Sequence, residues 1–378
     1  MTDKYKAAVL QAVGGPFETW SLPAPERLPA GTFLLRVELT GICGTDAHIY
    51  QGHMPGIQYP VLLGHEIVGT IAALGEGVER DYLGRPVAAG DRIALLPSLS
   101  CGICYECSVA RVPARCPNKK PTYGFKNPAT SEPLLSGGYA EYLFAYNVGT
   151  IFFKTEIAPE RAVLMEPFAV AIHALDRSRI RLGDTVVVQG TGAIGLAAIA
   201  CARNSGASQI VAIGSPSGRL ELARRLGAHH TIDIAEVKTP GERLALVHEF
   251  LGSTRGASVV FGCVGRPAAF LEGISYTVAG GVMVEVGHFT DTGSIPFNPY
   301  SDLLKRNITI EGVFGYGSNY VGVFCRSIEF LENGDYPFER MVSHQVGLSQ
   351  IQDAIEALSG TFNLYGRDTI KVAVNPWL

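Results

Sequence analysis

The sequence predicts an α/β protein in which a doubly wound parallel sheet is inserted into a split β-rich domain. Residues 32–145 contain short apolar runs broken by Gly, Pro and Asp, which is typical of a β-rich region. From about residue 160, strand-like runs alternate with helical stretches, which favours a parallel sheet covered on both faces. After residue 312 the alternation stops. The α/β region therefore divides the β-rich region into two parts.

The individual elements follow from short apolar runs and from helical periodicity. In the first β-rich part, the expected strands are 34–39, 67–72 and 92–96. In the α/β part, we expect strands at 185–188, 210–213, 259–261 and 282–286, with helices at 193–205 and 219–226. In the last part, we expect helices near 321–333 and 350–358 and a strand at 370–374.

The composition describes a well-buried globular protein. The 378 residues are 47% hydrophobic and 17% charged, and this length favours two domains over a single core. The formal net charge of −4 does not suggest a nucleic-acid partner or an anionic membrane. The N-terminus lacks the pattern of a signal peptide, and no apolar run reaches the roughly 20 residues that span a bilayer. Because eight cysteines without secretion indicate a reducing compartment, we expect a cytoplasmic protein.

Four cysteines lie close together in the first β-rich part. Two residues separate Cys101 from Cys104 and Cys104 from Cys107, and Cys116 follows after eight more. This spacing is typical of a closed tetrahedral Zn²⁺ site in which no position is left for chemistry. Disulfides are the alternative, but the absence of a secretory signal favours metal. We therefore expect a structural zinc in a lobe at about residues 98–118.

A glycine-rich turn follows the strand at 185–188 and opens a helix. It reads Gln189-Gly190-Thr191-Gly192-Ala193-Ile194-Gly195. In a G-x-G-x-x-G turn, the first glycine makes the turn, the second lets the pyrophosphate approach, and the third lets helix and strand pack closely. Free N–H groups at the start of the helix favour the phosphates. The sequence therefore predicts a dinucleotide site.

The carboxylate that usually receives the ribose hydroxyls is missing. No Asp or Glu lies between Ala207 and Leu220, and Gly214 stands at the end of the second strand. Without that charge a 2′-phosphate is not repelled, and Ser215 and Arg219 offer it hydrogen-bond donors. Alternatively, Arg219 packs over the adenine in either cofactor class. The cofactor is expected to be NAD or NADP, with a slight preference for NADP.

A second group of reactive side chains comes from three separate segments. They are Cys43 in Gly41–His48, the His65-Glu66 pair, and Glu166 before Pro167. Singly, each has an ordinary structural explanation. Together they supply one thiolate, one imidazole and one or two carboxylates, which suits a catalytic zinc with an open position.

In these motifs the sequence resembles the zinc-dependent medium-chain alcohol dehydrogenases, over essentially the whole chain. In the family's order, the resemblance rests on Gly41–Asp46, Gly64–Glu66, the four cysteines, Glu166-Pro167 and Gly190–Gly195. It implies a Rossmann-type nucleotide domain inserted in a GroES-like catalytic domain. We therefore expect a catalytic domain at 1–165, a dinucleotide domain at 166–312, and a return to the catalytic domain at 313–378.

The resemblance also implies the roles of the site residues. Cys43, His65 and Glu166 are the expected ligands of the catalytic zinc, with Glu66 as an alternate or fourth ligand. Asp46 is expected to orient the metal-bound imidazole.

Thr45 and His48 resemble the family's proton relay. The threonine is expected to bond the alcohol, and the histidine is expected to pass its proton outward. Zinc would polarise the alcohol oxygen, and a hydride would pass to the nicotinamide.

The expected activity is hydride transfer between an alcohol and NAD(P), giving a ketone or aldehyde. Glutamate at position 166 is similar to the branches that act on secondary alcohols, polyols and amino alcohols, so a secondary or polyhydroxylated substrate is expected. We also expect a homodimer or homotetramer. Two alternatives are a metal-independent enoyl or quinone reductase of the same fold and a catalytically silent nucleotide-binding protein. The aromatic candidates for the lining of the substrate pocket, with the hydrophobic core as the alternative place for each, are Tyr50, His53, Tyr59, Phe125 and Phe289.

Overall fold

The computed structural model describes residues 4–288 and 290–378 and divides into two compact units. The first unit comprises Met1–Glu166, Ser318–Gly334 and Val342–Leu378. The second comprises Pro167–Gly317 and Asp335–Met341. The chain thus leaves the first unit and returns to it, and each unit is described separately below.

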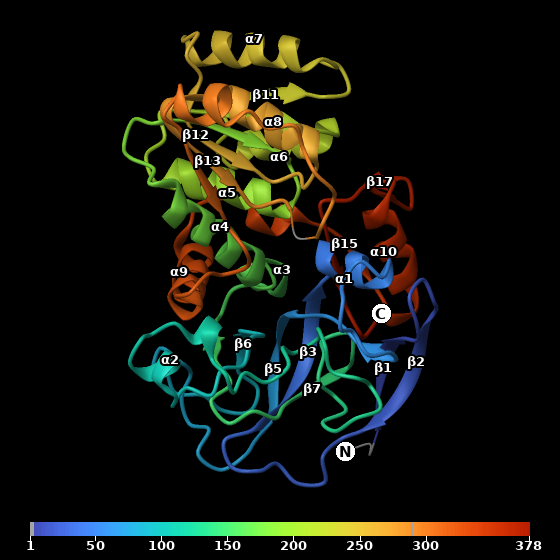
Figure 1. Cartoon of the computed structure of the whole chain (residues 1–378). Coiled ribbons are helices and arrows are strands. Elements are labelled where there is room, and N and C mark those ends of the chain that lie inside the picture. The colour runs from blue at the N-terminus through green and yellow to red at the C-terminus, as the bar shows by residue number, and fades with distance from the viewer. Residues whose placement is uncertain (1–3, 289) are drawn as a thin grey trace. The chain divides into compact units, whose positions relative to one another are not determined.

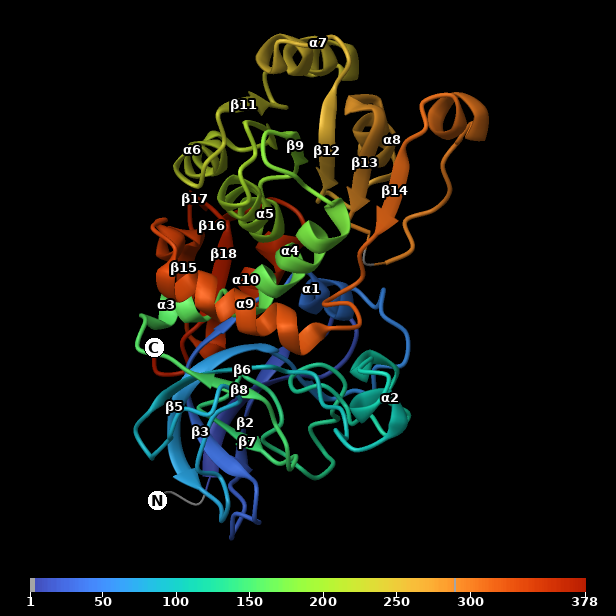
Figure 2. The same cartoon turned by 90° about the vertical axis from the view of Figure 1, so that its left-hand side faces the viewer.

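The second unit is built on a six-stranded parallel sheet with the order β11-β10-β9-β12-β13-β14 (Figure 2). Its strands are β9 (Thr185–Gln189), β10 (Gln209–Gly214), β11 (His230–Asp233), β12 (Ala257–Gly262), β13 (Thr277–Glu285) and β14 (Thr309–Gly312). The central strand reads as a continuous Val186-Val-Val188 run that is fully buried, as expected for a strand covered on both faces.

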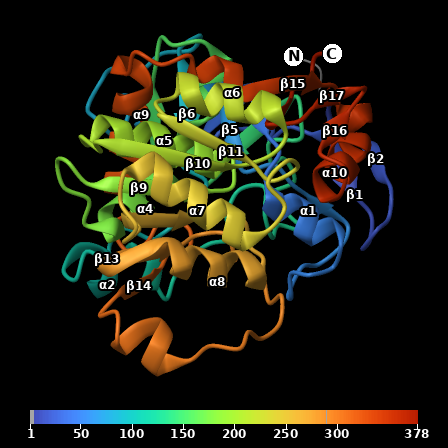
Figure 3. The same cartoon turned by 90° about the horizontal axis from the view of Figure 1, so that it is seen from above.

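Helices cover both faces of this sheet. They are α4 (Met165–Ser178), α5 (Ala193–Asn204), α6 (Ser217–Arg225), α7 (Pro240–Leu251) and α8 (Pro267–Tyr276), with short helical turns at Pro299–Leu304 and Phe338–Met341. Seen from above, α5 and α6 lie on one side of the strands and α7 and α8 on the other (Figure 3). The predicted doubly wound parallel sheet is therefore confirmed. Its strand order reverses beside β9, where such sheets bind ligands.

The first unit is β-rich, with two sheets and a short hairpin (Figure 1). The larger sheet has the order β15-β18-β3-β5-β6-β8, and β7 also pairs with β3. Its strands are β3 (Phe33–Gly41), β5 (Glu66–Leu74), β6 (Arg92–Leu95), β7 (Tyr142–Ala145), β8 (Phe152–Lys154), β15 (Val342–Val346) and β18 (Lys371–Val374). The smaller sheet contains β1 (Lys4–Leu10), β2 (Phe17–Pro23) and β4 (Val61–Leu62), and the hairpin is β16 (Asn363–Leu364) with β17 (Arg367–Asp368).

Helices lie between these strands along the chain. They are α1 (Gly44–Tyr50), α2 (Tyr105–Ser108), α3 (Pro159–Ala162), α9 (Tyr320–Asn333) and α10 (Ile351–Ser359), with 3₁₀ turns at Pro113–Arg115 and Leu348–Gln350. The pairing of β3 with β5 places Gly41 opposite Glu66, and the pairing of β18 with β3 places Ala373 opposite Gly41. Three distant segments therefore meet at one end of the larger sheet.

No helix among the described residues is both long enough and apolar enough to span a bilayer.

Candidate functional site

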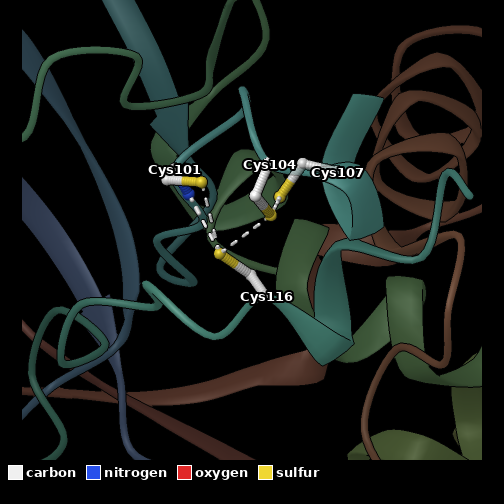
Figure 4. Close-up of side chains that lie close together, drawn as sticks. All are labelled: Cys101, Cys104, Cys107 and Cys116. Atoms are coloured by element: carbon white, nitrogen blue, oxygen red, sulfur yellow. Dashed lines mark hydrogen bonds between the residues drawn. The ribbon is translucent and has the colours of Figure 1, made fainter. Parts of the chain in front are cut away.

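The four cysteines of the predicted lobe converge on one point (Figure 4). The sulfur of Cys104 lies 3.4 Å from that of Cys107 and 3.9 Å from that of Cys116, which in turn lies 3.5 Å from the sulfur of Cys101. All four are free thiols. Zn–S bonds of about 2.3 Å in a tetrahedron separate the sulfurs by about 3.8 Å. These four side chains therefore fit one zinc ion.

The lobe's thiols differ in acidity. Backbone N–H groups of Ile103 and Cys104 lower the pKa of Cys101 to about 6. Burial, followed by hydrogen bonding with Cys104, raises the pKa of Cys107 to about 12. A thiolate is therefore available for metal at neutral pH, and a cation would deprotonate the others.

The lobe is also tied to helix α9 of the same unit. The hydroxyl of Tyr320, which is 2% exposed, donates to the hydroxyl of Ser100 at 2.7 Å. No motif marks Tyr320 in the sequence, because its partner lies 220 residues away.

A second group of possible ligands brings together Cys43, His65 and Glu66. One ligand atom from each lies within 4.8 Å of the others. Cys43 is the N-cap of α1, and Glu66 begins β5, so the starts of a helix and a strand present these side chains. Gly64, with φ of +90°, makes the turn before His65, and a Cβ there would lie 2.5 Å from a ring carbon of Tyr139.

Asp46 lies behind the histidine, as predicted, and is fully buried. Its Oδ2 accepts from the backbone N–H of Cys43 at 2.9 Å and from the hydroxyl of Tyr139 at 2.8 Å. Its Oδ1 lies 3.6 Å from Nδ1 of His65, which leaves Nε2 of the ring for a metal. Burial alone would lower the pKa of His65, but the Asp46 carboxylate raises it well above its ordinary value.

Glu66 has a partner that the sequence analysis missed, Lys371 on β18. The Lys371 ammonium donates to Oε1 of Glu66, and to the carbonyl oxygen of Ile42 at 3.0 Å. Both charged side chains are buried, with 5% and 1% exposed. Burial raises the pKa of Glu66 to about 7, against the opposing effect of the Lys371 charge. In the sequence, this pair is indicated only by the presence of a lysine within the apolar run Ile370–Val374.

Glu166 begins helix α4 and is 7% exposed. Its charge helps to raise the pKa of Glu66, after the larger effect of burial. Among the described residues, however, the group of ligand atoms within 4.8 Å contains Glu66 and not Glu166.

The predicted relay residues lie on α1. Thr45 is buried, and its Oγ1 lies 3.5 Å from the sulfur of Cys43. Nδ1 of His48 is buried and has no hydrogen-bond partner in the described part of the chain. Burial, followed by the nearby His53 ring at 5.7 Å, lowers the pKa of His48. The His48 ring is therefore neutral at neutral pH and can accept a proton.

The aromatic residues that were expected to line the substrate pocket make different kinds of contact. Phe125 lies edge-on to His65, with 6.1 Å between ring centroids. Tyr50 and Tyr59 use their hydroxyls in bonds within the fold. Phe289 lies outside the described residues.

The glycine turn of the second unit has the geometry that a pyrophosphate needs. Gly190 has φ of +94°, and a Cβ on Gly195 would lie 1.8 Å from the Gly190 carbonyl oxygen. A Cβ on Gly192, the N-cap of α5, would meet no atom within 4 Å. The remaining residues of the predicted motif, Thr191, Ala193 and Ile194, complete the turn and begin the helix.

The structure explains why residue 214 is a glycine, which the sequence alone did not. A Cβ there would lie 2.2 Å from Oγ1 of Thr191, which is buried and has no hydrogen-bond partner among the described residues. The threonine thus occupies the space beside the end of β10, where a carboxylate would otherwise stand. Ser215 follows, half-buried, and Arg219 is buried in the first turns of α6.

Comparison with known proteins agrees with this geometry. Residues 29–155 match the alcohol dehydrogenase GroES-like domain, and residues 193–332 match the zinc-binding dehydrogenase family. The chain is 34% identical to 5-exo-hydroxycamphor dehydrogenase of Pseudomonas putida, over 93% of this chain and 95% of that protein. It is 32% identical to sorbitol dehydrogenase of Bacillus subtilis, over 94% and 93%.

Solved structures give the same result. An alcohol dehydrogenase from Thermotoga maritima, 27% identical, matches 98% of this chain and 99% of its own with a TM-score of 0.84. A putative zinc-binding dehydrogenase from Sinorhizobium meliloti bound to NADP, 29% identical, matches 99% of each chain with a TM-score of 0.81.

The fold and the two groups of ligand side chains thus define a nucleotide-dependent oxidoreductase that uses zinc. The chain belongs to the zinc-dependent medium-chain alcohol dehydrogenase family. It is an NAD(P)-dependent alcohol dehydrogenase, as the sequence analysis expected, and the comparisons do not support the enoyl reductase or the silent nucleotide-binding protein.

Proposed function

We propose that the enzyme interconverts a secondary alcohol and its ketone, with a catalytic zinc at Cys43 and His65 and a structural zinc in the four-cysteine lobe. The observation that carries this proposal is the convergence of thiol, imidazole and carboxylate within 4.8 Å, with Asp46 behind the imidazole. One thiolate, one imidazole and one carboxylate suit a catalytic zinc, whereas four sulfurs suit a structural one. We propose Glu66 or Glu166 as the carboxylate ligand of this zinc.

The protein residues orient the alcohol and move its proton. When bound, zinc supplies Lewis acidity, which lowers the pKa of a ligated hydroxyl, and NAD(P) supplies the hydride acceptor. Thr45 Oγ1 would accept the hydrogen bond from the alcohol, since it lies beside the sulfur of Cys43. Nδ1 of His48 is buried, unpartnered among the described residues and neutral, so it would accept the proton next.

The substrate class follows from the relatives. Those relatives act on hydroxycamphor, sorbitol, arabinitol and threonine, according to their names. Each of these compounds carries a secondary hydroxyl group. We therefore propose a secondary alcohol, cyclic or polyhydroxylated, as the substrate of this enzyme.

For the nucleotide we propose a preference for NADP over NAD. No carboxylate lies between Ala207 and Leu220, and Thr191 fills the space beside Gly214. Ser215 and Arg219 carry donor groups that suit a 2′-phosphate. Gly214→Asp would be a poor test, since its Cβ would collide with Thr191. Ser215→Asp places a carboxylate at a half-exposed position and should lower affinity for NADP more than for NAD.

A substrate panel tests the proposed activity. Reduction of NAD and of NADP should be measured over cyclic secondary alcohols, linear secondary alcohols, polyols and primary alcohols. Turnover of secondary alcohols well above that of primary ones, with two zinc ions per chain, is the expected result. Tight nucleotide binding without turnover of any alcohol would contradict it.

We propose a homodimer or homotetramer, which light scattering would measure. The free cysteines agree with a cytoplasmic location.

A further inference from the structure

Helix α9 carries two buried hydroxyl groups for which the proposed reaction gives no role. The buried residues of this helix recur every three to four positions, which is typical of a helix with one face in the core. Tyr320 and Ser327 lie on that face and are 2% and 0% exposed. Because a buried hydroxyl is costly unless it is hydrogen-bonded, the partners of these two side chains show what they hold in place.

Ser327 holds the peptide group that precedes Glu166. Its Oγ donates to the carbonyl oxygen of Met165 at 2.6 Å, and both residues are buried. That carbonyl belongs to the same peptide group as the N–H of Glu166, and a peptide group is planar. The hydrogen bond from α9 therefore fixes the orientation of the backbone from which the Glu166 side chain begins.

The backbone of Glu166 needs this support. The residue before a proline is disfavoured in the α conformation, because the proline ring crowds it. Glu166 nevertheless lies in the first turn of α4, directly before Pro167. It is 7% exposed and is one of the two carboxylates proposed for the catalytic zinc. A shift of this turn would therefore move a carboxylate of the proposed site.

Tyr320 links the same helix to the cysteine lobe. Its hydroxyl donates to Oγ of Ser100 at 2.7 Å, and the next residue in the sequence is Cys101, one of the four lobe cysteines. Tyr320 and Ser327 are seven positions apart, which is about two helical turns, so they lie on one face of α9. One rigid element thus contacts both the lobe and the residue before Glu166.

The far end of α9 is fixed as well. Arg161 on α3 donates to the carbonyl oxygen of Leu331 at 2.5 Å and to that of Gly334. All of these partners belong to the first unit. Because the helix is held at its start, middle and end, it shifts as a whole, and a displacement of the lobe would displace the start of α4.

We propose that Ser327 is a positioning residue for Glu166 and that helix α9 couples the cysteine lobe to the catalytic zinc site. The inference rests on the proposed function, since it takes Glu166 as a carboxylate of that site. When the lobe is ordered by its zinc, Ser100 and Tyr320 hold α9 where Ser327 contacts the Met165 carbonyl. When the lobe loosens, the Glu166 carboxylate loses its fixed position.

Ser327→Ala in the full-length enzyme tests the positioning role. Amide exchange in residues 168–172 of α4 should rise, because the first turn of that helix loses a hydrogen bond. The visible spectrum with Co²⁺ in the catalytic site should change, and kcat should fall by about tenfold or more at unchanged nucleotide affinity. Ser327→Thr keeps the hydroxyl and should restore these values, and Ser327→Cys, a weaker donor, should give intermediate ones. Unchanged exchange and spectrum in Ser327→Ala would overturn the proposal.

A double variant tests the coupling. Tyr320→Phe removes only the hydroxyl that bonds Ser100, so it should change exchange and spectrum in the same direction as Ser327→Ala, but by less. If α9 transmits the effect, adding Tyr320→Phe to Ser327→Ala should change neither any further. Effects that simply add would overturn the coupling, because each residue would then act on its own surroundings.

Ser359→Ala is the matched control. The Ser359 hydroxyl also donates to a helix carbonyl oxygen, that of Ile355 at 2.7 Å, and it lies in the same unit. It belongs to α10 and to neither metal group, so its loss should leave the exchange of α4 and the spectrum unchanged. If the unaltered enzyme binds zinc only in the lobe, the proposed function fails. The role of Ser327 in holding α4 is decided separately by amide exchange, which needs no catalytic ion.

Discussion

His48 is the residue through which the pH of the medium should act on turnover. Its pKa lies below the ordinary 6.5, because of burial and then the nearby charge of His53. The ring must be neutral to accept a proton, so alcohol oxidation should fall only below pH 6.5, as the ring becomes protonated. The pH profile of kcat/KM should show this acid limb, and His48→Gln should lack it.

His53→Gln provides the complementary variant. Removing the neighbouring imidazole removes one of the two causes that lower the pKa of His48. The acid limb should therefore move toward pH 6.5 while the maximal rate stays similar. A limb that stays in place would show that another group controls it.

Cys43 separates the two proposed metal sites. Its sulfur lies with His65 and Glu66, and the other four sulfurs form their own group. Cys43→Ser should lower turnover by more than about 100-fold, because a ligand is lost and not merely a supporting contact. Metal analysis should then find one zinc per chain, with nucleotide affinity unchanged. Two retained ions would contradict the assignment.

At the level of elements, the cysteine lobe should depend on its ion for stability. The regular structure of the lobe is a four-residue helix and a three-residue 3₁₀ turn, so the ion should supply much of its stability beside the Tyr320–Ser100 hydrogen bond. Structural zinc contributes about 10–16 kcal/mol of apparent binding free energy in zinc-finger peptides. Cys104→Ser should therefore lower Tm by at least about 5 °C, measured by calorimetry. Cys325→Ser, a half-exposed thiol outside both groups, is the control and should change Tm little.

The glycine turn before α5 permits a paired test of fold against binding. Gly192→Ala meets no protein atom within 4 Å, so stability should change by no more than about 1 kcal/mol. Its methyl group should nevertheless block the pyrophosphate and weaken nucleotide binding by about tenfold or more. Gly195→Ala should destabilise the fold by about 1–3 kcal/mol, since its Cβ would lie 1.8 Å from a carbonyl oxygen. Chemical denaturation and nucleotide titration distinguish the two.

Elements that are determined by residues close together in the sequence could be predicted from it. The buried valine run of β9 and the glycine turn that follows it appear in the structure within one residue of their expected bounds. Helix α4 was not predicted as an element, although Glu166 was identified within it. The Glu166-Pro167 pair is typical of both the start and the end of a helix. The sequence alone therefore does not show that a helix begins there.

At the scale of the whole molecule, the contacts that the sequence did not reveal are those between segments that lie far apart along the chain. Lys371 donates a hydrogen bond to Glu66, which lies 305 residues away in the sequence. Tyr139 donates one to Asp46, which lies 93 residues away. A single chain carries no signal for such pairs, because each member has an ordinary explanation where it stands. Cysteine and glycine motifs were visible because their members lie within a few residues of one another.

The metal-ligand candidates all belong to the first unit, and the glycine turn belongs to the second. Amide hydrogen exchange should therefore respond separately to the two kinds of ligand. Adding NADP should slow exchange in residues 185–233, because binding N–H groups there protects them. Removing zinc with a chelator should raise exchange in residues 98–118 instead. Equal changes in both regions upon either treatment would contradict this separation.

The acidic thiol of Cys101 has a practical consequence for anyone purifying this enzyme. A half-exposed sulfur whose pKa is about 6 is largely ionised in neutral buffers whenever the lobe has lost its metal. Ionised thiols react fastest with peroxide and disulfide reagents, and three further sulfurs lie within bonding reach after small movements. Preparations stored with a strong chelator and without reductant should thus become cross-linked within the lobe and fail to reload, whereas a phosphine reductant with trace zinc should preserve them.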